Sequence, residues 1–158
     1  MTSKIVNFNL NGHDVEVIAK PLTTLQTVLR EQLHYTATKV GCKQGGCGSC
    51  TVLVNGEPMA SCLLPVEDVA GQQIMTLEGL TPAEGLHPIQ EAFIENYAVQ
   101  CGYCSPGMIM VIKALLDRSP QPTREDIIEA ISGNLCRCTG YEPIIEAAQD
   151  AARRLNNG

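Results

Sequence analysis

The placement of its cysteines is the feature that most constrains this chain of 158 residues. Eight cysteines form two groups of four, and none lies outside these groups. The first group has the spacing C-x4-C-x2-C and closes after eleven further residues; its members are Cys42, Cys47, Cys50 and Cys62. The second group consists of two close pairs with 31 residues between them; its members are Cys101, Cys104, Cys136 and Cys138. The sequence therefore predicts two separate four-thiol sites.

The first group has the spacing of a plant-type [2Fe–2S] ferredoxin loop. Four glycines lie in or beside it and allow the backbone to fold closely around an anionic cluster, with N–H groups pointing inward; they are Gly41, Gly45, Gly46 and Gly48. Lys39 and Lys43 near this group, and Arg137 within the second group, could offset part of the negative charge of a cluster; the two lysines are equally well explained as ordinary solvated side chains. Two complete ligand sets in one small chain indicate a role in electron transfer.

Two other uses of cysteine compete with this interpretation. Disulfide frameworks are typical of short secreted chains, whereas residues 1–5 show no apolar signal segment and the Cys136-x-Cys138 pair is awkward to bridge to two partners. We therefore expect free thiols in a reducing cytoplasm. Zinc suits four thiolates and remains an alternative for the second group, while the four-residue gap and the glycines disfavour it for the first.

Composition excludes several classes of function. Apolar residues make up 44% of the chain, but there is no Trp and there are only two Phe, so bound clusters would help to staple the fold. The formal net charge is −6, and no basic run indicates binding to nucleic acid or to an anionic membrane. No apolar stretch reaches the length of a membrane span. The sequence also shows no Ser/His/Asp arrangement, paired carboxylates or phosphate loop, so we expect no substrate-converting site in this chain.

The first half of the chain has the pattern of a small sheet with one helix. Apolar alternation on both sides of Asn11-Gly12 predicts a hairpin. Asn55-Gly56 predicts a second one, between residues 51–54 and the segment around residues 59–64. A helix capped by Thr23 or Thr24 follows the first hairpin, and a strand near residues 74–77 completes a β-grasp arrangement. We assign residues 1–78 to this domain, and the Gly- and Pro-containing stretch of residues 77–88 has the composition of a linker at its boundary.

The second half, residues 79–158, has the pattern of four helices. One helix begins at Pro88, one at Ser105-Pro106 and one at Thr123, where Asp126 forms a capping pair; the last contains residues 144–151. Both cysteine pairs of this half precede a helix, which places a cluster near the positive ends of the helix dipoles. The repeated helix–turn–helix unit predicts two hairpins related by a pseudo-twofold axis.

Three segments resemble a known family. Residues 41–50 (GCKQGGCGSC) are similar to the ferredoxin-like loop of the molybdenum hydroxylases, the xanthine oxidase group. Residues 100–108 (QCGYCSPGM) and 133–141 (GNLCRCTGY) resemble the family's second iron–sulfur signature. The resemblance extends over residues 4–154 and is to the separate small iron–sulfur subunit of bacterial members.

The resemblance implies an α+β fold, in which an N-terminal β-grasp, ferredoxin-like [2Fe–2S] domain precedes an all-α four-helix [2Fe–2S] domain. The implied ligands of the first cluster are Cys42, Cys47, Cys50 and Cys62. Those of the second cluster are Cys101, Cys104, Cys136 and Cys138. The helical-domain cluster is implied to lie next to the pterin, with Gln100 and Cys138 against it.

The resemblance also implies partners: a large subunit with molybdenum on a pterin cofactor, a medium subunit with FAD, and assembly as a dimer of heterotrimers. The complex would hydroxylate an electron-poor carbon of an N-heterocycle, aldehyde or related substrate, and two electrons would leave singly through this chain to flavin or another acceptor. The alternatives are a free-standing two-cluster ferredoxin that acts as a shuttle, and a zinc-stapled interaction module. A second cluster domain favours the fixed subunit over the shuttle.

Overall fold

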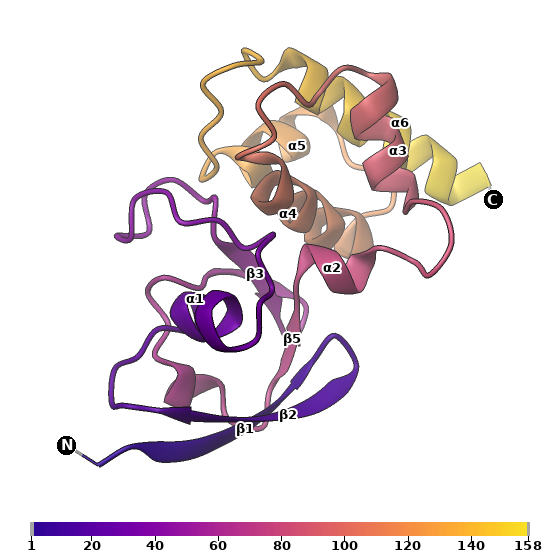
Figure 1. Cartoon of the computed structure of the whole chain (residues 1–158). Coiled ribbons are helices and arrows are strands. Elements are labelled where there is room, and N and C mark those ends of the chain that lie inside the picture. The colour runs from indigo at the N-terminus through magenta and orange to yellow at the C-terminus, as the bar shows by residue number, and fades with distance from the viewer. Residues whose placement is uncertain (1, 158) are drawn as a thin grey trace.

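A five-stranded mixed sheet forms the N-terminal half of the computed structural model, which describes residues 2–157 (Figure 1). The strand order is β2-β1-β5-β3-β4, in which β1 and β5 are parallel and the other neighbours are antiparallel. The strands are β1 (Lys4–Leu10), β2 (His13–Ala19), β3 (Thr51–Val54), β4 (Glu57–Ala60) and β5 (Gln73–Met75). Two hairpins with β5 between them thus build the predicted β-grasp sheet.

Both predicted hairpin turns are confirmed. Asn11 and Gly12 have φ values of 52° and 86°, and Asn55 and Gly56 have values of 50° and 86°. Positive φ at both central residues is the geometry whose twist matches that of the paired strands, and Asn-Gly adopts it readily. The second hairpin is shorter than its apolar pattern indicates, because β4 ends at Ala60.

One helical segment crosses the sheet. It begins as α1 (Leu25–Thr27), with Thr24 as its N-cap, and continues as the π-helical turn η1 (Val28–Gln32). The Thr24 hydroxyl accepts a hydrogen bond from the Thr27 N–H at 3.3 Å. The apolar side chains of this helical segment pack into the core of the sheet half. The buried residues of that core are Val6, Phe8, Leu10, Val17, Ala19, Leu25, Val28, Leu29, Val52, Val54, Val66, Val69 and Ile74. A 3₁₀ turn, η2 (Val66–Val69), closes this core.

Helices form the C-terminal half. They are α2 (Leu77–Leu80), α3 (Pro88–Glu95), α4 (Ser105–Arg118), α5 (Arg124–Ile131) and α6 (Glu142–Asn157). The sequence predicts the last four, and the Thr123–Asp126 capping box that opens α5 is present. The short helix α2 lies where the sequence indicates only a linker. His87 caps α3, and its Nδ1 accepts a hydrogen bond from the Ile89 N–H at 3.2 Å.

The two halves share part of their cores. The helical core contains Phe93, Met108 and Ile112, and it also contains Leu53, which comes from β3. Helix α4 packs against β3, and Met75 and Leu77 lie against the helical core. This contact surface fixes α4, whose N-terminus follows Cys104, relative to the sheet. Among the described residues, no helix is both long enough and apolar enough to cross a membrane.

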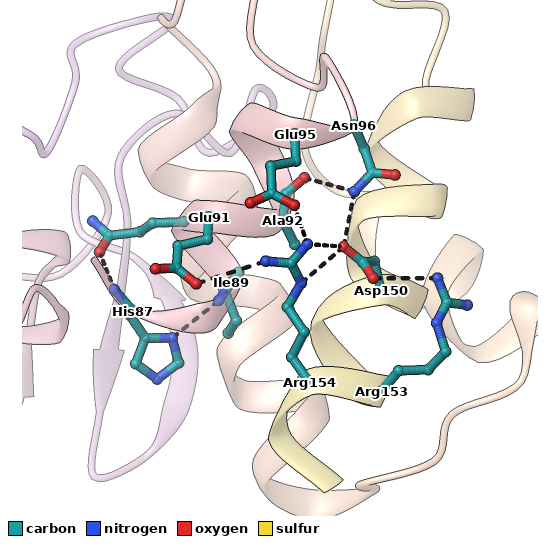
Figure 2. A network of polar contacts seen from close by, with 10 residues as sticks. His87, Ile89, Glu91, Ala92, Glu95, Asn96, Asp150, Arg153 and Arg154 are labelled. Atoms are coloured by element: carbon teal, nitrogen blue, oxygen red, sulfur yellow. Dashed lines mark hydrogen bonds and ion pairs between the residues drawn. The ribbon is translucent and has the colours of Figure 1, made fainter. Parts of the chain in front are cut away.

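An ionic network joins α3 to α6 (Figure 2). The Arg154 guanidinium lies between Glu95 of α3 and Asp150 of its own helix, and Asn96 donates a hydrogen bond to Asp150 at 3.1 Å. Arg154 lowers the pKa of Glu95 by hydrogen bonding. Burial alone would raise the pKa of Asp150, but the hydrogen bonds from Arg154 and Asn96 outweigh burial and hold that pKa below its usual value.

Acid is therefore expected to weaken the α3–α6 contact. A carboxyl group whose pKa is lower in the folded than in the unfolded state stabilises the fold above its unfolded pKa, and that contribution is lost as the pH falls through the folded pKa. When the pH is lowered from about 7 to about 3, the Arg154→Met variant should lose less of its unfolding free energy than the unmodified chain loses. Urea unfolding followed by far-UV circular dichroism measures this difference. The matched control is Arg153→Met, because Arg153 is exposed and also contacts Asp150, at 3.3 Å. Equal pH dependence in Arg154→Met and in the unmodified chain would contradict this prediction.

Candidate metal centres

The first four cysteines meet where the loop after η1 passes the end of the β3–β4 hairpin. Cys50 immediately precedes β3, and Cys62 lies two residues after the end of β4. Ser61 fastens this end of the hairpin, because its hydroxyl donates to the Cys50 carbonyl at 2.7 Å. Cys50 and Cys62 are only 2% and 6% exposed, whereas Cys42 and Cys47 in the loop are half-buried. The hairpin thus supplies a rigid pair of thiols, and the loop supplies the second pair.

The thiols of this first set affect each other's ionisation. Cys47 helps to lower the pKa of Cys42, and Cys50 helps to raise the pKa of Cys62. The Gln44 N–H donates to Cys42 Sγ at 3.4 Å and, with smaller contributions from neighbouring donors, lowers the pKa of Cys42 to about 7. Burial raises the pKa of Cys62 to about 11. Backbone donors directed at sulfur are what an anionic cluster with four thiolates requires.

The glycines leave room for these sulfur atoms. A Cβ atom on Gly41 would lie 2.6 Å from Cys47 Sγ, and one on Gly45 would lie 2.4 Å from the Leu63 side chain. Gly46 has open space around its Cα; its N–H is one of the donors to Cys42. The predicted close approach of backbone to sulfur therefore depends on Gly41 rather than on all four glycines equally.

The second four cysteines lie in two turns of the helical half. Cys101 and Cys104 lie between α3 and α4, and Cys136 and Cys138 lie between α5 and α6. The Sγ atoms of Cys101 and Cys138 are 3.6 Å apart, and the Cys104 thiol pairs with Cys136. Cys101 and Cys138 are exposed, whereas Cys104 and Cys136 are half-buried. Cys104 is the N-cap residue of α4, as expected for a cluster at a positive helix end.

Polar groups around the second set affect its thiols unequally. Burial raises the pKa of Cys104 to about 12, and the hydrogen bond with Cys101 raises the pKa of Cys138. Burial would also raise the pKa of Cys136, but hydrogen bonds, chiefly from Thr139, outweigh it and lower that pKa. The Cys136 N–H donates to the Tyr141 hydroxyl at 3.0 Å, and Tyr141 has a φ of 71°. Thr139 and Tyr141 lie in the motif of residues 133–141, but the sequence pattern alone does not indicate their contacts with Cys136.

The arrangement of thiols in pairs fits a binuclear cluster. A tetrahedral zinc site needs all four thiolates around one point. A [2Fe–2S] cluster instead takes two thiolates on each of its two irons. The neighbouring thiols Cys42–Cys47, Cys50–Cys62, Cys101–Cys138 and Cys104–Cys136 are compatible with this two-by-two arrangement.

Two family models match the chain, and together they span nearly all of it. The model described as "2Fe-2S iron-sulfur cluster binding domain" matches residues 2–95, and that described as "[2Fe-2S] binding domain" matches residues 76–149. The nicotinate dehydrogenase small FeS subunit of Eubacterium barkeri is 45% identical over 99% of this chain and 100% of its own length. This chain belongs to the small iron–sulfur subunits of the molybdenum hydroxylase family.

Solved structures of this family share the fold of the subunit. Quinoline 2-oxidoreductase from Pseudomonas putida 86 aligns with a TM-score of 0.95 and 41% identity, covering 100% of this chain and 99% of the matched chain. The aldehyde oxidoreductase of Desulfovibrio gigas aligns with a TM-score of 0.92 and 41% identity over 99% of this chain, which corresponds to 17% of that longer chain. The subunit is thus an iron–sulfur component of an oxidoreductase, and in that longer relative the matching segment is part of a larger chain. The predicted α+β fold is confirmed.

Proposed function

We propose that this subunit holds two [2Fe–2S] clusters and passes electrons singly from a molybdenum–pterin site in a large partner subunit to flavin or another acceptor. The observation that carries the proposal is the grouping of all eight thiols into two separate sets of two pairs. Bound clusters supply reversible one-electron chemistry; the chain supplies the thiolates, inward N–H donors and partial burial that hold them. The proposed ligands are the eight cysteines predicted from the sequence.

The exposure of the two sets supports a direction for electron flow. Cys101 and Cys138 are exposed, and Gln100 is exposed beside them, so this corner of the helical half is accessible to a pterin held by the large subunit. The first set lies behind the Gly45–Gly46 loop and the exposed side chain of Leu63, which we propose face the acceptor. The proposal includes an FAD-containing medium subunit, a dimer of heterotrimers and a reducing compartment, in which thiols remain available to bind iron.

The reaction of the whole complex is also part of the proposal. Relatives are named for nicotinate, quinoline and aldehyde substrates, which share an electron-poor carbon. We propose that the complex hydroxylates such a carbon in an N-heterocycle or aldehyde. The substrate is selected outside this chain, which contributes only the electron path.

Metal analysis tests the proposed cofactors. The purified complex is expected to contain about four iron atoms and about four acid-labile sulfides per copy of this chain, with two distinguishable paramagnetic signals after reduction. The signals should differ because one set lies in a hairpin loop and the other at helix ends, and hydrogen bonding to sulfur changes the potential. Zinc at the second set would contradict that half of the proposal. If all of this chain purified without partner subunits, the result would favour a shuttle ferredoxin.

Gln100→Ala tests the proposed contact with the pterin. The variant is expected to keep both clusters but to slow turnover of the complex or to retain less pterin, a penalty of about 1–3 kcal/mol for leaving buried polar groups of the pterin unpaired. Rapid-reaction spectroscopy that follows molybdenum reoxidation separately from the second cluster measures the effect. Gln44, exposed beside Cys42 in the other set, offers the matched control as Gln44→Ala. Normal reoxidation with a disturbed second-cluster signal would show that Gln100 only orders its turn.

A further inference from the structure

The two cysteine loops touch each other directly. The Leu135 N–H donates a hydrogen bond to the Cys47 carbonyl at 2.9 Å, and Leu135 is followed by Cys136. This bond therefore connects the backbone of a proposed ligand in the first set to the residue that precedes a proposed ligand in the second. In Figure 1 the loop between α1 and β3 and the loop between α5 and α6 lie on the same side of the molecule.

A buried amide fastens the contact. Asn134 is 5% exposed, and its Nδ2 donates to the Gly48 carbonyl at 3.0 Å. The same carbonyl accepts a hydrogen bond from the Thr51 hydroxyl at 2.7 Å. Asn134 thus holds the segment immediately after Cys47 against the segment immediately before Cys136. The two residues of this bond are separated by 86 positions in the chain.

Glycine allows the loops to approach this closely. A Cβ on Gly107, in the first turn of α4, would lie 2.3 Å from the Gly48 carbonyl oxygen and 3.0 Å from Asn134 Nδ2. Gly48 has a φ of 68°, and a Cβ there would lie 2.6 Å from the Gly133 carbonyl oxygen. The absence of a side chain at Gly107 therefore permits the Gly48 carbonyl to lie against the first turn of α4, beside Asn134. Any larger residue at Gly107 would act as a wedge, because it would push the Gly48 carbonyl away from α4.

We propose that Gly107 and Asn134 are positioning residues for electron transfer between the two clusters. The transfer moves one electron, which oxidises one site and reduces the other, and no bond forms or breaks. Electron tunnelling weakens exponentially with distance and is stronger through bonds and hydrogen bonds than across gaps. The Cys47 carbonyl, its hydrogen bond from Leu135 and the Leu135–Cys136 peptide form such a route. This inference depends on the proposed function, because it requires both clusters.

The Gly107→Ala variant tests the wedge. Alanine is a better helix former than glycine, so α4 itself is not weakened, but the 2.3 Å approach must open beyond 3.0 Å. In the assembled complex we expect intercluster transfer to slow severalfold, because tunnelling weakens exponentially with the distance between the clusters. The magnetic interaction between the two reduced clusters should weaken, while iron and sulfide contents stay unchanged. Rapid-freeze electron paramagnetic resonance measures the transfer rate and the magnetic interaction, and chemical analysis measures the iron and sulfide contents.

The matched control is Gly133→Ala. It makes the same chemical change beside Asn134, where an added Cβ meets nothing within 4 Å. The control should transfer electrons at the rate of the unmodified complex. Equal slowing in Gly107→Ala and Gly133→Ala would overturn the inference, because slowing would then not depend on the wedge.

Asn134→Ala provides a second test if Gly107→Ala does not fold. It removes the bond to the Gly48 carbonyl without adding bulk, so deuterium exchange at the peptide containing Leu135 should accelerate and transfer should slow. Asn96→Ala controls for general loss of stability. The Asn96 amide donates hydrogen bonds to the Ala92 carbonyl and to Asp150 in the α3–α6 network. Unchanged transfer and unchanged magnetic interaction in Asn134→Ala would overturn the inference. Fewer than two clusters in the unmodified complex would instead overturn the proposed function.

Discussion

A Cys136→Ser variant is expected to lose one of the two iron–sulfur signals and to keep the other. Cys136 pairs with Cys104 in the helical half and makes no pair with the first set. Iron and acid-labile sulfide should therefore fall from about four to about two per chain. Because the second cluster would tie the α3–α4 turn to the α5–α6 turn, hydrogen exchange in α4 and α5 should also accelerate. Metal analysis, electron paramagnetic resonance and exchange mass spectrometry measure the three effects.

The reciprocal variant, Cys50→Ser, is the control for this experiment. Cys50 pairs with Cys62 in the sheet half, so its replacement should remove the other signal and leave exchange in the helices slow. Loss of both signals in each variant would show that the two sites do not assemble independently. Unchanged helical exchange in Cys136→Ser would show that the second cluster does not act as a folding staple.

Gly41→Ala is expected to disrupt the first cluster although it replaces no ligand. The added Cβ would lie 2.6 Å from Cys47 Sγ, a separation that real Cβ atoms essentially never show. Either the sulfur or the loop must move, so that Cys47 no longer matches the position of its partner Cys42. We expect the iron content to fall toward about two atoms per chain, with the second signal intact.

Gly46→Ala is the matched control in the same loop. Gly46 precedes Cys47 directly, and a Cβ there meets nothing within 4 Å. It should keep the full iron content and both signals. If Gly41→Ala also kept them, the position of Cys47 Sγ would be less restricted than the 2.6 Å approach indicates. If both variants lost the first cluster, the loop would depend on glycine for backbone freedom rather than for space near sulfur.

Much of the fold follows from signals that act within a few residues. Asn11-Gly12 and Asn55-Gly56 form the predicted turns because both central residues adopt positive φ, which Asn and Gly tolerate well. Thr123 and Asp126 form the predicted capping box, since a helix start needs acceptors for its unpaired N–H groups. The limits of β4, the helix α2 and the π-helical turn η1 differ from the sequence pattern, because tertiary packing decides where such short elements end.

The candidate sites divide in the same way. Cysteine spacing alone assigned all eight thiols to two sets, because ligands that share a site recur at short, characteristic intervals. Spacing does not determine which thiols pair, and the pairing of Cys101 with Cys138 appears only once α3–α4 and α5–α6 have packed. The contact of Asn134 with Gly48 carries no local signal, since it depends on how α4 packs on β3. Local chemistry thus determined what each loop can bind, and the packing of the two halves alone determined that the loops touch.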